Sequence, residues 1–199
     1  MKSSQDPFAI LNDSVDVVAQ RLLGCELVRE IDGQTVRVRI VETEAYDQTD
    51  AASHSYKGKT PRTEIMFGPS GHLYVYFTYG MHYCCNVVVG EVGYGAAVLI
   101  RAVEPIEGED AMAAQRPYKN GIELTNGPSK LCQALGIDRK MNGHDLHEPP
   151  FRLVIQPKRP QAEIVTTKRV GISQAKETLW RYYLQGNPYV SGKHRHIDK

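Results

Sequence analysis

The chain has 199 residues, of which 41% are hydrophobic and 24% are charged, and its formal net charge is +1. This composition is that of a globular protein, and the length allows one well-buried domain or at most two small ones. No apolar run approaches the ~20 residues of a membrane span, and the N-terminal residues lack the apolar core of a secretion signal. We therefore expect a protein with no membrane partner and a cytoplasmic location.

In chain order, the pattern predicts a helix over residues 13–23, followed by two strands over 25–30 and 35–46 that are joined by the hairpin signal Asp32-Gly33. A long polar segment, 47–70, comes next. Further strands are predicted at 71–78, 81–89, 96–103 and 151–156, and further helices at 108–116, 129–135 and 173–185. Consecutive strands with short turns indicate an antiparallel meander, so we expect one α+β domain over residues 1–199.

Charge is unevenly spread along the chain. Residues 1–50 carry 5 Lys/Arg against 10 Asp/Glu, whereas residues 139–199 carry 12 against 5. The basic C-terminal part is compatible with a footprint for a polyanion, or with solvated faces alone. The basic tail at 192–199 is a candidate for disorder. The four cysteines form no CxxC pair, so we expect reduced and mostly buried thiols.

The strand over 35–46 ends in two glutamates. Its even positions 36, 38 and 40 are apolar, whereas Arg37 and Arg39 take odd positions. If that alternation holds, Glu42, Glu44 and Tyr46 follow the apolar residues inward. A buried carboxylate must be paired, hydrogen-bonded or protonated, so two beside a tyrosine indicate the floor of a cleft for proton or water chemistry. The alternative is that the strand ends at Val41 and that both glutamates are solvated.

Aromatic residues form a second candidate feature. Tyr74 and Tyr76 share one side of the strand over 71–78, and the opposite side, which includes Phe77, is apolar and predicted to face the core. With Tyr46 and His54, Tyr76 could flank a flat ligand, and such aromatic rings hold nucleobases at ~1–3 kcal/mol per stacked base. Taken singly, each tyrosine is explained as well by an interfacial core position.

Tyr79 lies at a tight turn before Gly80, where a small polar residue is more common. A bulky side chain on a rigid hairpin is what a wedge into the DNA minor groove requires. We keep both readings open, a wedge and an ordinary turn residue.

A metal site is an alternative use of the same region. Glu42, Glu44, His54 and His82 could serve a metal-dependent hydrolase, but the chain has no HExxH, no CxxC and no other paired ligand spacing. We therefore predict no metal and no other cofactor.

Six segments of the chain occur in an order that is specific when they are taken together. They are Val41-Glu42-Thr43-Glu44-Ala45-Tyr46, Ala51-Ala52-Ser53-His54-Ser55, Thr60-Pro61-Arg62, 73–81, 124–132 and Arg169-Val170-Gly171-Ile172-Ser173. Together they resemble the alkyladenine (3-methyladenine) DNA glycosylase family of base-excision repair, over about residues 19–191. The resemblance implies a curved antiparallel sheet with peripheral helices, similar to the C-terminal domain of methionyl-tRNA formyltransferase.

The resemblance also implies residue roles. Glu44 would orient and deprotonate a water for attack on C1′ of the damaged nucleotide, and Arg101 and the main-chain carbonyl of Val170 would help to hold that water. The implied base pocket consists of Tyr46, His54, Tyr76 and Asn86, the last of which would hinder the exocyclic amine of normal guanine. Tyr79 would intercalate in the duplex. Apart from the resemblance, the basic charge of the C-terminal part and the place of Lys130 at a helix start lead us to expect contacts to the DNA backbone from Lys130, Lys168 and Arg169.

The implied partner is double-stranded DNA that contains damaged purines: 3-methyladenine, 7-methylguanine, hypoxanthine or ethenoadenine. A flipped base would be released by hydrolysis, leaving an abasic site without strand cleavage, in a reaction that needs no cofactor. We expect a monomer. A non-catalytic lesion or RNA binder that keeps the fold is the other alternative.

Overall fold

The computed structural model describes residues 6–78 and 80–192. Its strands are β1 (Glu26–Ile31), β2 (Gln34–Tyr46), β3 (Leu73–Thr78), β4 (His82–Val88), β5 (Ala97–Glu107), β6 (Phe151–Val154), β7 (Ile164–Thr167) and β8 (Arg181–Leu184). Its α-helices are α1 (Val15–Arg21), α2 (Glu109–Gln115) and α3 (Pro128–Ala134). Short 3-10 turns are η1 (Pro7–Asn12), η2 (His54–Lys57), η3 (Glu64–Phe67), η4 (Gly121–Leu124), η5 (Arg139–Met141) and η6 (Gln161–Glu163).

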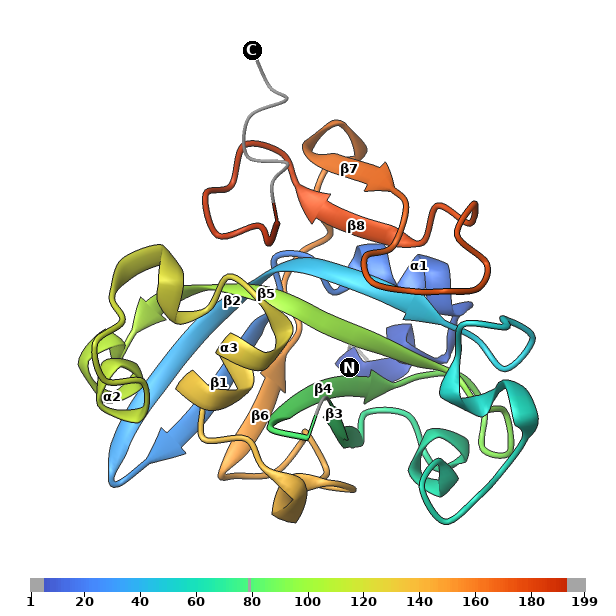
Figure 1. Cartoon of the computed structure of the whole chain (residues 1–199), viewed down its shortest axis with the longest axis horizontal. Helices are drawn as coiled ribbons and strands as arrows, with labels where there is room; N and C mark the ends of the chain where they lie inside the picture. Colours follow the sequence, from blue (N-terminus) through green and yellow to red (C-terminus); the bar gives the residue numbers. More distant parts are fainter. Residues whose placement is uncertain (1–5, 79, 193–199) are drawn as a thin grey trace, which may run out of the picture.

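All strands belong to one antiparallel sheet with the order β3-β4-β5-β2-β1-β6, and β8 pairs with both β2 and β7. The long strand β2 therefore has β5 along one edge, and β1 and then β8 along the other (Figure 1). This arrangement confirms the predicted α+β class and the antiparallel sheet. The likeness to the formyltransferase domain stays a prediction.

The β1–β2 hairpin turns where the sequence predicts it. Asp32 and Gly33 both have positive φ, at 48° and 80°, as a two-residue type I′ turn requires. Ile31 pairs directly with Gln34 across this turn. The turn thereby sets the register of β2 against β1.

The predicted helix over 173–185 is wrong. Residues 171–177 form bends and turns, and the next regular element is β8. Arg181, Tyr182 and Leu184 are buried in this strand, and β8 gains ladder partners from two strands at once. Tertiary pairing thus overrides a weak local helix preference, as it often does. The strand β7 was not predicted either.

Of the three register shifts in the pairing of β2 with β5, two lie next to Glu42. The register shifts on both sides of Glu42. Before Glu42, Val41 of β2 has no partner in the β5 register, and after it, Arg101 of β5 has no partner in the β2 register. Each is an extra residue relative to the opposite strand, as in a β-bulge, and bulges redirect the side chains beside them. The two shifts compensate, so regular pairing resumes at Thr43.

The bulge at Val41 changes which positions of β2 face the hydrophobic core. Ile40 and Val41 both belong to the core, and beyond them Ala45 continues the apolar row, while the Thr43 hydroxyl donates to the carbonyl of Ala19 in α1 at 2.8 Å. The glutamates are therefore buried, as predicted, but on the side away from this row. Strict alternation along the whole strand was the wrong reason for their burial.

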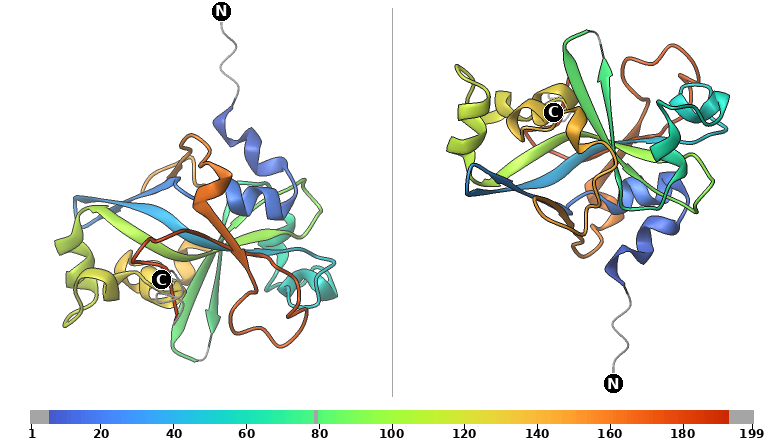
Figure 2. Two further views of the ribbon diagram at one scale, coloured as in Figure 1. Left: turned by 90° about the horizontal axis from the view of Figure 1, so that it is seen from above. Right: turned by 90° about the horizontal axis from the view of Figure 1, so that it is seen from below.

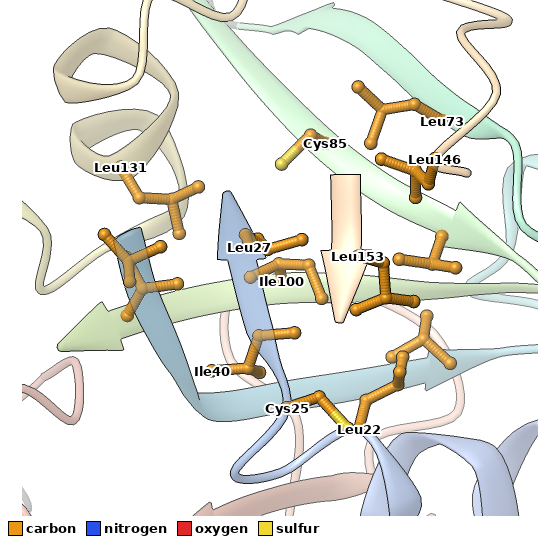
Figure 3. Packing of buried hydrophobic residues seen from close by; sticks show 14 of the residues in the cluster. Leu22, Cys25, Leu27, Ile40, Leu73, Cys85, Ile100, Leu131, Leu146 and Leu153 are labelled. Atoms are coloured by element: carbon orange, nitrogen blue, oxygen red, sulfur yellow. The ribbon is translucent and has the colours of Figure 1, made fainter. Parts of the chain in front are cut away.

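The core supports this part of β2. Buried side chains from several elements pack together here (Figure 3). They are Leu22 at the end of α1, Ile40 in β2, Ile100 in β5, Leu131 in α3 and Leu153 in β6. Burying each such side chain contributes about 1.5–3 kcal/mol. The segment that carries the glutamates is thus anchored to the main hydrophobic core.

The β3–β4 hairpin extends away from the body of the sheet (Figure 2). Its root is buried at Leu73 and Val75, but Phe77 is 50% exposed, and its ring lies 5.1 Å from that of Tyr83, measured between centroids. The prediction that Phe77 faces the core is therefore wrong, because the hairpin extends beyond the hydrophobic core. In the described part of the chain, no helix has the length and apolarity to cross a membrane.

Candidate active site

The Glu44 carboxylate is fully buried and held by three donors. The main-chain N–H of Val170 donates to Oε1 at 2.7 Å. The Tyr46 hydroxyl and Arg101 Nη1 donate to Oε2 at 2.8 and 3.3 Å. Burial is the largest influence on this group and raises its pKa, although Arg101, the Val170 N–H and Tyr46 all act to lower it. Such a carboxylate is a stronger base than an exposed one.

Glu42 lies two residues before Glu44 on strand β2 and is equally buried. Its Oε1 accepts from Arg101 Nε at 2.9 Å and Arg181 Nε at 2.6 Å. Ser191 donates to both oxygens, through its hydroxyl at 3.0 Å and its main-chain N–H at 2.6 Å. Two buried carboxylates and two buried guanidinium groups thus form one charge-balanced network, which is the condition for burying such groups.

A cavity of about 350 Å³ opens beside this network. Its walls include six residues predicted for the site: Tyr46, His54, Tyr76, Asn86, Arg101 and Val170. Glu44 itself contributes no wall, since it lies behind the three groups that hold it, all of which line the cavity. The structure therefore brings the predicted pocket together in front of the predicted catalytic carboxylate.

His54 is a neutral member of the pocket. Its ring meets Tyr76 edge-on at 4.6 Å between centroids, and its Nδ1 lies 3.0 Å from the Tyr74 hydroxyl. Burial, and then the nearby positive charge of Arg62, lower the pKa of His54 to about 4. The imidazole is therefore uncharged at physiological pH and serves as an aromatic wall.

The polar segment 47–70 is ordered around the pocket rather than loose. Turns η2 and η3 within it carry His54 and Met66 to the cavity wall, and Arg62 reaches the cavity from the stretch between them. The Ser55 hydroxyl donates to the carbonyl of Gly95 at 2.7 Å, which ties the segment to the strand β5 side of the sheet. The Asn86 side chain is also held in place, because its amide N–H donates to the Tyr74 carbonyl at 3.0 Å.

Arg169 does not fit the predicted contact to the DNA backbone. Its side chain is fully buried, its guanidinium forms an ion pair with Asp50, and Nη2 lies 3.0 Å from Asp50 Oδ1. The guanidinium lies 4.8 Å from the ring centroid of Tyr46 and 5.4 Å from that of Trp180. Such a cation–π contact supports the pocket tyrosine from behind.

The other two residues predicted to contact the DNA backbone lie at the surface. Lys130 is bonded to Glu123 and Asn126, both at 2.7 Å, and Lys168 to Glu177 at 2.5 Å. Exposed pairs of this kind are weak and can exchange for phosphate contacts, so the predicted backbone role of both lysines stays a prediction. Tyr79, predicted to intercalate, lies outside the described residues.

Sequence reasoning missed three members of the site. Arg181 and Ser191 reach Glu42 from positions far along the chain, and the helix expected over 173–185 concealed the strand that presents Arg181. Arg62 was part of a quoted segment but received no role; it lies over the Tyr76 ring at 5.8 Å and 3.5 Å from His54 Nε2.

Metal binding was the competing hypothesis. Within residues 6–78 and 80–192, no three His, Cys, Asp or Glu side chains gather as a metal site would require. Both glutamates of that hypothesis are engaged by arginines instead. The four cysteines are buried and unpaired, with Cys84 at the cavity and Cys85 in the core.

Comparison with known proteins identifies the family of this chain. Residues 9–188 match the family model described as methylpurine-DNA glycosylase (MPG). Relatives named "Putative 3-methyladenine DNA glycosylase" include one from Carboxydothermus hydrogenoformans, 54% identical over 89% of this chain and 93% of the relative. Another, from Nitrosospira multiformis, is 44% identical over 100% of this chain and 99% of the relative. The chain therefore belongs to the methylpurine-DNA glycosylase family, a family of DNA N-glycosylases.

Proposed function

We propose that this protein is a monofunctional DNA glycosylase that flips alkylated or deaminated purines out of duplex DNA and hydrolyses their N-glycosidic bond. The observation that carries the proposal is the position of Glu44, buried with a raised pKa directly behind an aromatic cavity. A volume of about 350 Å³ is at the small end of ligand pockets and suits one base. A base inside a duplex cannot reach such a cavity unless it is extruded.

The aromatic walls account for binding. Tyr46, His54 and Tyr76 present uncharged rings, and a purine alkylated at N3 or N7 is a cation that such rings attract. The buried amide of Asn86 stands at the same cavity, where we assign it the rejection of the exocyclic amine of guanine. Candidate substrates are 3-methyladenine, 7-methylguanine, hypoxanthine and ethenoadenine.

Glu44 accounts for the chemistry. As the bond from C1′ to the base breaks, positive charge develops on the sugar, and a nearby carboxylate stabilises it. Glu44 takes the proton of the attacking water, the water oxygen forms the new bond to C1′, and the base leaves with the bonding electrons. A cationic base departs neutral, which makes this step easy. A neutral base such as hypoxanthine must gain a proton as it leaves.

The test uses duplexes that each contain one damaged purine, incubated with the protein in excess chelator and then treated with hot alkali. Strand cleavage only after alkali supports a metal-free monofunctional glycosylase, because an abasic site is stable until alkali breaks the strand. Cleavage before alkali would contradict the monofunctional proposal. Activity lost on adding chelator would favour the metal hydrolase, and binding without any base release would favour a lesion binder.

A further inference from the structure

Glu42 has no part in the mechanism above, although it is as deeply buried as Glu44. A carboxylate offers about four lone-pair positions to hydrogen-bond donors. Glu42 accepts four hydrogen bonds, from Arg101, Arg181 and twice from Ser191. Among the described residues Glu44 accepts three. Three of the four hydrogen bonds to Glu42 end on its Oε1, whereas on Glu44 Oε1 the described residues supply one donor, the main-chain N–H of Val170. Glu42 is therefore held by more donors than Glu44, and Glu44 keeps capacity to accept a further hydrogen bond on Oε1.

Arg101 is shared unequally between the two carboxylates. Its Nε lies 2.9 Å from Glu42 Oε1, whereas its Nη1 lies 3.3 Å from Glu44 Oε2. Its Nη2 donates to the Ser191 hydroxyl at 3.1 Å. The register shift at Arg101 turns its side chain toward the carboxylates, and these three contacts hold its guanidinium there.

Glu42 is itself held from the opposite side. Arg181, in β8, donates to Glu42 through Nε and to the Ser191 carbonyl through Nη2 at 3.1 Å. Ser191 therefore contacts Glu42, Arg101 and Arg181 together. These contacts fix the position of Glu42, so that its attraction for the Arg101 guanidinium competes with that of Glu44.

We propose that Glu42 is a positioning residue for the reaction: it holds the Arg101 guanidinium back from Glu44, so that Glu44 stays free to accept a proton from water. This inference rests on the proposed function, in which Glu44 is the base. Without the pull of Glu42, Arg101 would close on Glu44 as a tight ion pair, and a carboxylate so paired is a weaker base.

The charged and titratable groups that face Glu44 come from three strands and one loop. They are Glu42 and Tyr46 on β2, Arg101 on β5, Arg181 opposite it on β8, and the Arg169–Val170 segment. Replacing Glu42 by glutamine removes a negative charge and also releases Arg101. Both effects favour the ionised form of Glu44, so they shift its protonation in the same direction.

The test compares Glu42→Gln with the wild type on a lesion duplex, under single-turnover conditions and across pH. We expect at least a ten-fold lower rate of base release, a shift of the Glu44 ionisation to lower pH, and lesion binding within about two-fold of the wild type. The matched control is Glu104→Gln, which removes the carboxylate that pairs with Arg39 on the same sheet outside the site and leaves rate and pH profile unchanged.

An unchanged rate and pH profile in folded Glu42→Gln would overturn the proposal, and so would a lower rate without a shift in the pH profile, because loss of packing alone produces that. Should Glu42→Gln fail to fold, Ser191→Ala removes only the hydroxyl that Glu42 and Arg101 share, and the same shift is expected at smaller size. An inactive wild type would instead refute the proposed function. In that case, carbon-13 NMR titration of the Glu44 carboxyl still tests whether Glu42→Gln lowers its pKa.

Discussion

At the scale of single residues, the site depends on how different hydrogen-bond partners give different roles to groups of the same type. Glu42 and Glu44 share a strand and a depth of burial, yet Glu42 accepts four hydrogen bonds, three of them on Oε1, whereas the described residues give Glu44 three. Tyr46 is similarly specialised, since its hydroxyl donates to Glu44 while its ring lines the cavity. Burial, and then the charge of Glu44, raise the pKa of Tyr46, so it remains a donor throughout the physiological range.

His54 provides a pH prediction at this scale. Its pKa of about 4 means that the imidazole is neutral from pH 5 to 8, so it should not contribute an ionisation to activity in that range. The folded state binds its proton less readily than the unfolded chain, so stability should rise with pH as pH passes from about 4 to the ordinary histidine value. NMR titration of the His54 ring measures this directly.

Arg62→Ala is the informative variant for His54, because it removes the second contribution to the lowered pKa and leaves burial in place. We expect the pKa of His54 to rise toward, without reaching, its ordinary value. A His54 that titrates near 6.5 in the unaltered protein would refute its assignment as a neutral aromatic wall.

At the scale of elements, the site is assembled where β2, β5 and β8 meet with two loops. The double register shift around Glu42 directs Arg101 toward the carboxylates, and the segment before β8 supplies the N–H that holds Glu44. The Arg169–Asp50 ion pair then joins that segment to the loop that carries His54. It holds two walls of the cavity together.

The contribution of this clamp, the Arg169–Asp50 ion pair, can be tested by measuring the free energy of unfolding. Arg169→Leu leaves the buried Asp50 carboxylate, only 3% exposed, without its partner, and removing one member of a buried pair costs about 3–5 kcal/mol. We expect that loss in the free energy of unfolding from urea denaturation. The neighbouring Lys168→Ala, which breaks an exposed pair, should cost at most about 1 kcal/mol. Equal effects of the two substitutions would show that the clamp has no special role.

The sequence predicted much of this assembly. The residues that it did not predict were missed for one physical reason, which is that only tertiary contacts bring them to the site. The resemblance identified Tyr46, His54, Tyr76, Asn86 and Arg101, and local turn signals predicted the hairpins. Partners joined only by tertiary contacts were not predicted: Arg181 and Ser191 lie more than a hundred residues from Glu42. The surface role expected of Arg169 was inferred from charge alone, which does not reveal a buried carboxylate partner such as Asp50.

At the scale of the whole molecule, charge asymmetry is the feature that bears on DNA. The basic excess of residues 139–199 includes groups that the structure buries, such as Arg169 and Arg181. The surface available to phosphates is therefore smaller than the sequence count implies. Lys168, together with Lys130 from outside that region, remains a candidate because both are partly exposed.

Binding to a lesion duplex should weaken steeply with salt, since each neutralised phosphate releases counterions. We expect at least a ten-fold loss of affinity between 50 and 200 mM salt, as for a protein with several phosphate contacts. Lys168→Ala and Lys130→Ala should each reduce the slope of log affinity against log salt by about one, whereas Arg169→Lys should not. A flat salt dependence would contradict a backbone footprint.

The most direct measurement of the central claim compares Glu44→Gln with the wild type on a hypoxanthine-containing duplex, recording both base release and binding. Glutamine keeps the size of the side chain but cannot accept the proton of the attacking water. The account predicts binding that is equal or tighter, together with a loss of base release of at least a hundred-fold. Base release by Glu44→Gln at the wild-type rate would contradict it.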